Sequence, residues 1–444
     1  MKRIAFSIVC AFVVWGGASA EQPRQPITAQ PFTPDNVPTE WTLQALIDTA
    51  MAKSALLSDY AYKIEGQAVE QEWLRAVYMR SQVEVTGEWL FVPVVARDGG
   101  KTAFLWNAQS GTDYYGYDLG ESSGHLHAGV QWTQPLLGTF AYKAERSQVD
   151  AQTAALQHQA RMERHRLERI VAEQYLLCLL SRAQVACADT IDSLLVQQTA
   201  VLERMAESGL AKQSDVRLLR IEQQANNDMR LAAEQDYTQH LADLRAICGL
   251  RADEPVVLPA QDADIALTAT ADRSLFAETY RLDSLRMEAE RQALRAPYLP
   301  QLDVFVNGGL QTGDYDRMYR HFGWAAGLTF RWKIYDGRQQ QLRTRQIRLR
   351  QDANATYRSS AERQRRIRLQ QCLDTWRQYD KCLQTAARQL AEYDAVMQDY
   401  AREMQAGQLS VLDYLTLLRR RVQVRQDYLL LLANRNLAAV AYNY

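Results

Sequence analysis

The placement of proline constrains this chain more than any other feature of its sequence. No proline occurs in the 119 residues from Leu136 to Glu254, or in the 144 residues from Gln301 to the end of the chain. A proline inside a helix costs about 3 kcal/mol, so stretches of this length permit very long helices. From Leu136 to Gly209 the chain would form a helix of about 110 Å, and it would then return as an antiparallel helix to Gly249. The apolar positions lie close to a heptad stripe, which predicts coiled-coil packing of long hairpins: Val171, Tyr175, Cys178 and Val185.

The first 20 residues predict the compartment. Lys2 and Arg3 precede an apolar segment from position 4 to 15, and small residues at 18–20 fit a cleavage site before Glu21. We interpret residues 1–20 as a secretory signal peptide; the alternative, a membrane anchor, needs a longer apolar segment.

The chain carries 51 basic and 52 acidic residues, so no excess positive charge is present to bind nucleic acid.

The chain repeats its own organisation. Residues 21–40 form a proline-rich extended segment, and a helical pattern then runs from about 41 to 80. We predict a helix–strand–strand–helix unit at 41–250, a linker at 251–267 and a second such unit at 268–444. Gly209 and Gly407 at the helix breaks are 198 residues apart, as are Asp215 and Asp413. A constant offset with matching element order indicates duplication of one structural unit.

Four segments alternate between apolar and polar residues: 82–91, 125–133, 301–310 and 321–333. Period-two alternation over about ten residues is typical of strands in a membrane β-barrel, with the apolar face toward lipid. The alternative is two hairpins half-buried on a soluble core. In the barrel interpretation, the expected lipid-facing aromatic residues are Trp89, Trp132, Trp324, Phe330 and Trp332.

Four strands cannot close a barrel, and an unpaired strand edge in lipid costs several kcal/mol per backbone group. About eight strands is the smallest closure, so several chains must contribute strands to one barrel. Three chains would give twelve strands and an open lumen, whereas two would give eight and little room for transport.

The helix breaks and strand ends carry a family resemblance. The relevant segments are Ser208–Ala211 with Asp215-Val216, Ala406–Asp413, Tyr298–Gln301 and Trp332–Gly337. In order and spacing they resemble the TolC-like outer-membrane efflux proteins. The resemblance implies a mainly α fold with a membrane β-barrel portion. Three chains would form a twelve-stranded barrel continued by a periplasmic α-barrel of helical hairpins. It also implies a homotrimer in outer-membrane lipid that docks to a periplasmic adaptor and an inner-membrane RND or ABC transporter.

The resemblance also implies a pore constriction near the second helix break. Leu409, Asp413 and Thr416 occupy the corresponding positions, but the best-studied members have an arginine and a second aspartate where this chain has Leu409 and Thr416. A single ring of Asp413 carboxylates is therefore expected. Alternatively, Asp413 belongs to a Ser410-x-x-Asp413 capping pattern, and both roles are compatible. Asp215, near Gly209 in the first hairpin turn, is expected to be structural.

The other polar clusters in the sequence do not indicate a catalytic or metal-binding site. His125 and His127 share one strand face, but two ligands do not make a metal site, so we interpret them as lumen-lining polar residues. Nine arginines between Arg343 and Arg368 either line a passage for anions or form a solvated helix face, and the solvated face is favoured. We expect no enzyme activity, cofactor or metal.

The predicted function is the outer-membrane duct of a tripartite efflux pump or type I secretion system, exporting small molecules or proteins. The alternative is a periplasmic coiled-coil scaffold or adaptor without a channel.

Overall fold

The computed structural model describes residues 40–89, 94–98, 101–105, 126–259, 265–268, 273–312, 322–406, 408 and 410–444. The predicted signal peptide and nearly all of the segment 21–40 lie outside the described residues. So do Gly407 and Leu409 of the second hairpin turn, together with Phe91, His125 and the side chain of Trp89.

Two sets of elements follow each other in matching order. The first set is α1 (Leu43–Lys53), α2 (Ala55–Met79), β1 (Gln82–Trp89), β2 (Val94–Asp98), β3 (Lys101–Leu105), β4 (Leu126–Pro135), α4 (Gly138–Glu207) and α5 (Gln213–Cys248). The second set is α6 (Arg273–Ala293), the 3-10 turn η2 (Ala296–Tyr298), β5 (Gln301–Thr312), β6 (Phe322–Arg331), α7 (Gln339–Gln405) and α8 (Val411–Asn443). The long helices predicted from the proline-free stretches are confirmed. The division into repeats at 41–250 and 268–444 stays a prediction.

Two local expectations were wrong. The helix predicted over 41–80 is interrupted at Ser54, whose hydroxyl accepts a hydrogen bond from the Leu57 N–H at 3.3 Å and so begins α2 as a new helix. The sequence between the first two predicted strands is rich in glycine and tyrosine and predicts a loop, but it contains the antiparallel hairpin β2–β3.

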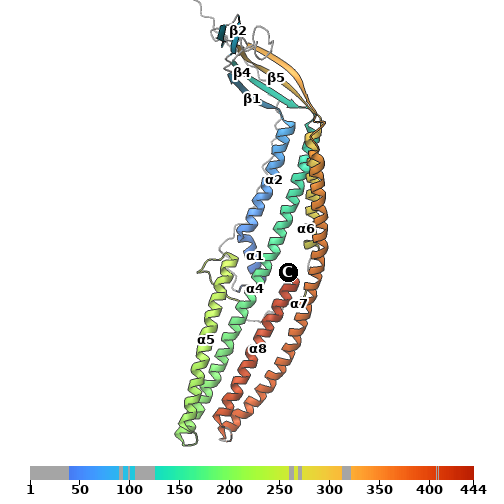
Figure 1. Cartoon of the computed structure of the whole chain (residues 1–444). Coiled ribbons are helices and arrows are strands. Elements are labelled where there is room, and N and C mark those ends of the chain that lie inside the picture. The colour runs from blue at the N-terminus through green and yellow to red at the C-terminus, as the bar shows by residue number, and fades with distance from the viewer. Residues whose placement is uncertain are drawn as a thin grey trace, which may run out of the picture.

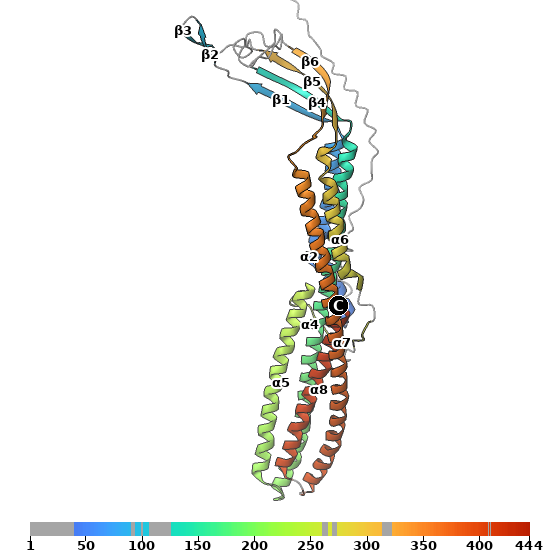
Figure 2. The same ribbon diagram turned by 45° about the vertical axis from the view of Figure 1, so that its right-hand side comes forward.

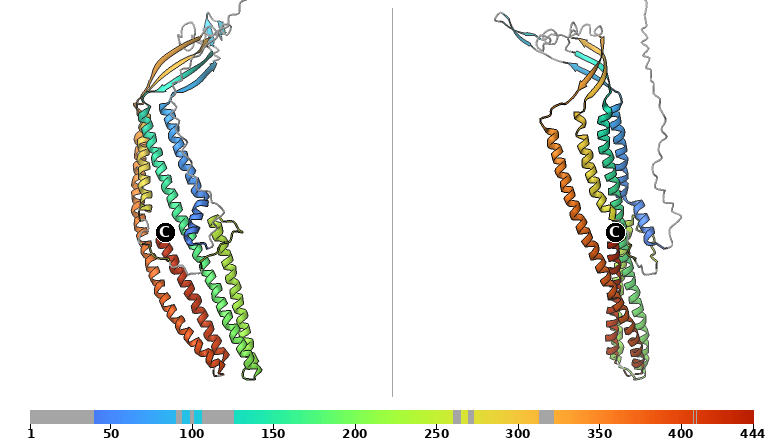
Figure 3. Two further views of the ribbon diagram at one scale, coloured as in Figure 1. Left: turned by 180° about the vertical axis from the view of Figure 1, so that it is seen from behind. Right: turned by 90° about the vertical axis from the view of Figure 1, so that its right-hand side faces the viewer.

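The helices form a single curved layer below the sheet (Figure 1). Near the sheet the order across the layer is α2, α4, α6, α7, and farther away it is α5, α4, α8, α7. Helices α4 and α7 run the full length, while the chain ends at Tyr444 about halfway along it (Figure 2). The views in Figure 3 show that the layer is long and thin. A layer one helix thick leaves two faces and two side edges open in the single chain.

The sheet has the order β1-β4-β5-β6 and is antiparallel throughout. Its outer strands continue into the outer helices of the layer, because β1 follows α2 and β6 precedes α7. One side edge of the molecule is therefore β1 with α2, and the other is β6 with α7.

Two buried apolar clusters hold the layer together. Halfway along, Trp41 and α1 pack against α4 and α5, with the fully buried Leu46 and Leu244 at the centre. At the end far from the sheet, both hairpins share one cluster that includes Leu195, Leu219, Tyr414 and Leu418. The two hairpins are thus packed together at their tips, and an ion pair between Arg419 and Glu222 at 2.6 Å joins α8 to α5 on the surface.

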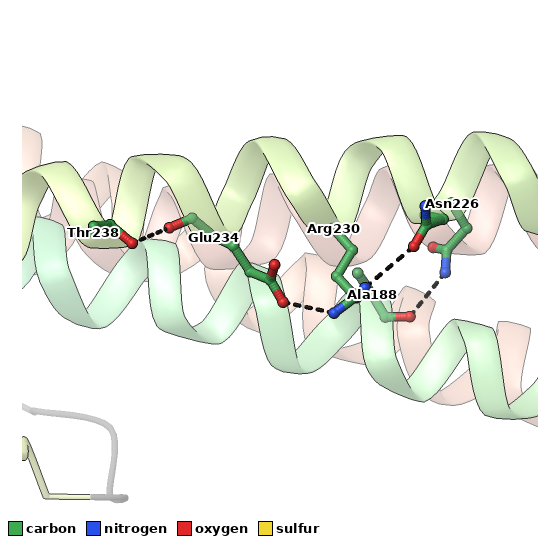
Figure 4. Close-up of polar contacts among 6 residues, drawn as sticks. Ala188, Asn226, Arg230, Glu234 and Thr238 are labelled. Carbon is green, nitrogen blue, oxygen red and sulfur yellow. Dashed lines mark hydrogen bonds and ion pairs between the residues drawn. The ribbon is translucent and has the colours of Figure 1, made fainter.

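A buried side-chain amide links the two helices of the first hairpin. The Asn226 side chain on α5 is 2% exposed and donates a hydrogen bond to the carbonyl oxygen of Ala188 on α4 at 2.9 Å (Figure 4). Its neighbour Asn227 is exposed and accepts a hydrogen bond from Arg230 at 3.2 Å. A buried polar contact of this kind fixes the register of two coiled-coil helices.

We expect Asn226→Asp to destabilise the hairpin by about 3 kcal/mol, because it buries an unpaired carboxylate against a carbonyl oxygen. Asn227→Asp is the matched control: the same change on the exposed neighbour keeps an acceptor for Arg230 and should change stability by less than about 0.5 kcal/mol. Thermal unfolding followed by the helical circular dichroism signal measures both. Equal melting temperatures for the two variants would contradict the assigned role of Asn226.

Candidate functional site

The pairing register places the apolar side chains of all four strands on one face of the sheet. Val83 of β1 pairs with Trp132 of β4, which pairs in turn with Val306 of β5. Val306 pairs with Ala326 of β6. In the single chain this face is exposed, and Trp324 is 76% accessible. Large apolar side chains on all four strands are exposed with it: Val83, Val85, Val130, Trp132, Val306, Phe322, Leu328 and Phe330. Trp332, predicted to lie in the strand, directly follows β6 and is also exposed.

The opposite face carries polar and small residues. Glu84 pairs with Gln131, which pairs with Asn307. Phe305 breaks the alternation, because it is apolar on the polar face. It lies opposite Gly327, and a Cβ at Gly327 would approach the Phe305 ring to 2.8 Å. The ring therefore covers a backbone position that has no side chain, which accounts for the exception.

A hydrogen-bonded joint connects the second pair of strands to the helices. The Tyr298 hydroxyl, just before β5, donates to the carboxylate of Asp336, which lies after β6. Asp336 also accepts a hydrogen bond from the Gln340 N–H at 2.8 Å in the first turn of α7. These contacts hold the pKa of Asp336 below its usual value, first through Tyr298 and then through Gln340. The sequence motifs around positions 298 and 336 therefore meet in space, a contact that their separation in the chain did not predict.

A second joint lies where α2 ends and α4 begins. Gly138, the first residue of α4, is so close to α2 that a Cβ there would lie 1.8 Å from the carbonyl oxygen of Tyr78. Nearby, the Gln134 side-chain amide donates to the carbonyl oxygen of Met79 at 3.1 Å. Sequence reasoning did not assign this close approach to Gly138, although a glycine at the first position of a helix that shortly follows a strand is a signal of close backbone approach.

The first hairpin turn is a Schellman motif. Gly209 has φ +74°, the Leu210 N–H donates to the carbonyl of Met205 at 2.8 Å, and the Gly209 N–H donates to that of Ala206 at 3.1 Å. In the second turn the Gln408 N–H donates to the carbonyl of Glu403 at 2.9 Å. This bond is the counterpart of Leu210 to Met205, 198 residues later.

The candidate constriction residues lie at the tip of the second hairpin. Ser410 caps α8, since its hydroxyl accepts a hydrogen bond from the Asp413 N–H at 3.3 Å. Asp413 is exposed in the first turn of α8, and among the described residues its carboxylate has no hydrogen-bond or ion-pair partner. Thr416 is exposed and donates to the Leu412 carbonyl at 2.8 Å. Asp215 lies half-buried in the first turn of α5, where a negative charge suits the helix N-terminus.

The buried titratable groups serve packing. Burial raises the pKa of Cys178 to about 12 and that of Cys248 to about 11, so both thiols stay protonated at neutral pH. Burial also lowers the pKa of His158, whose Nε2 is 2.7 Å from the hydroxyl of Thr279 on α6. Within the described ranges, no three His, Cys, Asp or Glu side chains gather where they would hold a metal ion. None of the described helices combines the length and apolar character needed to cross a membrane.

Comparison with known proteins shows which solved structures share this arrangement of sheet and helices. No protein-family model matches the chain, and no curated protein sequence matches it. Several solved structures do match the chain. CusC, studied for the conformational changes that accompany folding and transmembrane channel formation, has 15% identity and a TM-score of 0.69, with 91% of each chain covered. The outer membrane protein VceC from Vibrio cholerae has 12% identity and a TM-score of 0.66, covering 90% of this chain and 94% of VceC. The MtrE outer membrane channel of Neisseria gonorrhoeae in its open state has 15% identity and a TM-score of 0.63, covering 90% of this chain and 88% of MtrE. The TolC-like fold of the single chain predicted from the sequence is therefore confirmed, and the twelve-stranded barrel of three chains stays a prediction.

Proposed function

We propose that this protein is the outer-membrane exit duct of a tripartite efflux pump or type I secretion system. The observation that carries the proposal is the exposed apolar face of an open four-stranded sheet, joined to a helical layer about 100 Å long. An apolar face of this size on a sheet needs cover, and lipid supplies it when the sheet closes into a barrel. The polar face then lines a lumen.

Closure requires other copies of the chain. The backbone groups on the free edges of β1 and β6 must be paired before the sheet can enter lipid. Three copies, each pairing β1 with β6 of the next, give twelve strands, and the helical layers below them form a tube in the periplasm. The tube would meet a periplasmic adaptor and an inner-membrane RND or ABC transporter, and the duct would act as a conduit rather than an enzyme. The fold shared with CusC, VceC and MtrE supports this arrangement.

A periplasmic coiled-coil scaffold is the second candidate, and the long hairpins alone would suit it. The exposed apolar sheet face argues against it, because a scaffold in water has no use for that face. Cell fractionation and the mass of the detergent-solubilised complex distinguish the two. The duct predicts recovery in the outer membrane and a mass of three chains. A soluble periplasmic protein, or a stable inserted monomer, would contradict it.

The Asp413 carboxylates provide a test of the lumen. In a ring of three copies, the tips of the α7–α8 hairpins converge at the periplasmic end, and three exposed carboxylates there would attract cations. We expect a modest cation preference at neutral pH that disappears when acid protonates the carboxylates. Asp413→Asn should reduce the preference and leave trimer stability unchanged, because Ser410 supplies the helix cap.

Reversal potentials in planar bilayers measure this change. Ser410→Ala is the matched variant: it removes the cap and keeps the charge, so it should lower stability by about 1 kcal/mol and retain the selectivity. Identical reversal potentials for wild type and Asp413→Asn would rule out Asp413 as the selectivity ring.

A further inference from the structure

A pocket of about 710 Å³ interrupts the helical layer halfway along its length. It lies between Phe276 and Tyr280 in the first turns of α6 and Tyr444, which follows α8. Helix α7 borders it through residues 361–373, and His165 of α4 lies on the other side. Helices α6 and α8 succeed each other along the layer, and the end of the chain marks the place where they meet in Figure 1. We call this hollow the junction pocket.

The equivalent junction in the first set of elements is filled. Helices α2 and α5 also succeed each other along the layer, and α1 lies where they meet (Figure 1). Trp41 is 1% exposed there, and its indole Nε1–H donates to the carbonyl oxygen of Pro255 at 3.2 Å. Apolar side chains that follow α5 are buried in the same cluster: Leu250, Val256 and Leu258. The architecture therefore does not itself require an open junction, and the junction pocket is a feature of the second set.

The walls of the junction pocket are largely apolar and aromatic. Helix α7 lines it at helical spacing with half-buried side chains: Ala361, Arg365, Leu369 and Cys372. The other walls supply aromatic rings: Phe276, Tyr280, Tyr442 and Tyr444. The His165 ring packs edge-on against Tyr444 with the ring centroids 5.3 Å apart, which fixes the wall on the α4 side. A pocket of this volume with mostly apolar walls suits a small organic molecule.

The charged side chains around the junction pocket are mainly positive. Among the described lining residues one is acidic, Glu362, and three are arginines: Arg365, Arg366 and Arg368. The Glu362 carboxylate accepts a hydrogen bond at 2.9 Å from Arg358, which does not line the pocket, so its charge is balanced from outside. The Arg365 guanidinium lies 5.1 Å from the centroid of the Phe276 ring, which places a cation against an apolar wall. The pocket thus combines an apolar body with a positively charged rim.

We propose that the junction pocket binds a small organic anion: a carboxylate, sulfonate or sulfate group on an aromatic or aliphatic body. Arg366 and Arg368 are exposed beside the pocket, and their planar guanidinium groups suit paired hydrogen bonds to an oxyanion. The body of the ligand packs on the apolar wall that includes Phe276 and Leu369.

The position of the pocket indicates where the ligand comes from. Residue 361 lies about 33 Å along α7 from the start of the helix beside the sheet, so a lipid held in the membrane does not reach it and the ligand comes from solution. The lining residues belong to one chain, so the site does not depend on a ring of copies. It assigns anion contact to the last turn of the arginine-rich segment, where the sequence favoured a solvated face.

A pair of probes that differ in charge tests the class of ligand. Naphthalene-2-sulfonate carries an anionic group on an aromatic body, and naphthalene-2-sulfonamide has the same body without the charge. With the full chain in lipid nanodiscs, and empty nanodiscs as the blank, calorimetric titration should show one saturable sulfonate site per chain. The sulfonamide should bind about tenfold more weakly or worse, because it lacks the charged hydrogen bonds. No saturable binding of the sulfonate, or equal affinity for both probes, would overturn the proposal.

Variants test the place of the site. Arg366→Gln with Arg368→Gln should weaken sulfonate binding about tenfold or more, because both charged donors are removed. Arg363→Gln is the matched control, since Arg363 is exposed on the same stretch of α7 but does not line the pocket, and it should leave the affinity unchanged. Ala361→Trp, or Ala277→Trp from the α6 wall, should fill the pocket and abolish binding while the helical circular dichroism signal stays the same. Unchanged affinity in the double arginine variant, an equal loss in the control, or full binding by both tryptophan variants would overturn the proposal.

Discussion

Ala326→Arg is expected to lower the yield of assembled protein in the outer membrane at least tenfold, whereas Ala325→Arg should retain most of it. The two alanines are adjacent in the middle of β6 and both are exposed, but their side chains lie on opposite faces. Ala326 belongs to the apolar face through its pairing with Val306, and Ala325 belongs to the polar face through its pairing with Asn307. An arginine facing lipid near the bilayer midplane costs about 2–4 kcal/mol per chain, and one facing a lumen does not.

Quantitative blotting of outer-membrane fractions measures the two yields, and total expression of each variant serves as the reference. Because the pair shares residue type, strand and exposure, a difference between them reports the face alone. Similar yields, whether both high or both low, would contradict the assignment of the apolar face to lipid.

The second large effect is expected at the joint between α2 and α4. Gly138→Ala should destabilise the folded chain by about 3 kcal/mol or more, because the new Cβ meets the Tyr78 carbonyl oxygen, a backbone atom that cannot move without displacing α2. Gly323→Ala is the control, since a Cβ at Gly323 meets nothing within 4 Å. It should be neutral or slightly stabilising, as alanine restricts the unfolded chain.

Denaturant unfolding of both variants, followed by the helical signal, gives the two free energies. A Gly138→Ala protein as stable as wild type would show that the two helices are farther apart than the structure places them.

The elements that the sequence predicted well are those with a long, regular period. Helices α4 and α7 follow from the absence of proline, and the one-sided apolar face of the sheet follows from alternation. Both signals depend on the chain's own spacing, and tertiary contacts do not override them over tens of residues.

What could not be predicted depends on contacts between distant segments. The break at Ser54 has a local element, the serine cap of α2, but the packing of α1 against α4 and α5 around Trp41 joins segments that are distant in the chain. The Tyr298–Asp336 contact joins residues 38 positions apart. The hairpin β2–β3 did have a signal, because two glycines at 99–100 separate its strands, and a glycine pair between apolar runs predicts a tight turn. Of the candidate site, the exposure of Asp413 agrees with a role in the lumen, while its position in a ring of copies stays a prediction.

The central claim is that three copies close one sheet across the outer membrane. Cryo-electron microscopy of the purified protein in lipid nanodiscs tests it most directly. We predict a three-fold ring within the lipid, with β1 of each copy paired to β6 of the next, and a helical tube extending from one side. A sheet that lies outside the lipid, or copies whose β1 and β6 edges remain unpaired, would contradict the account.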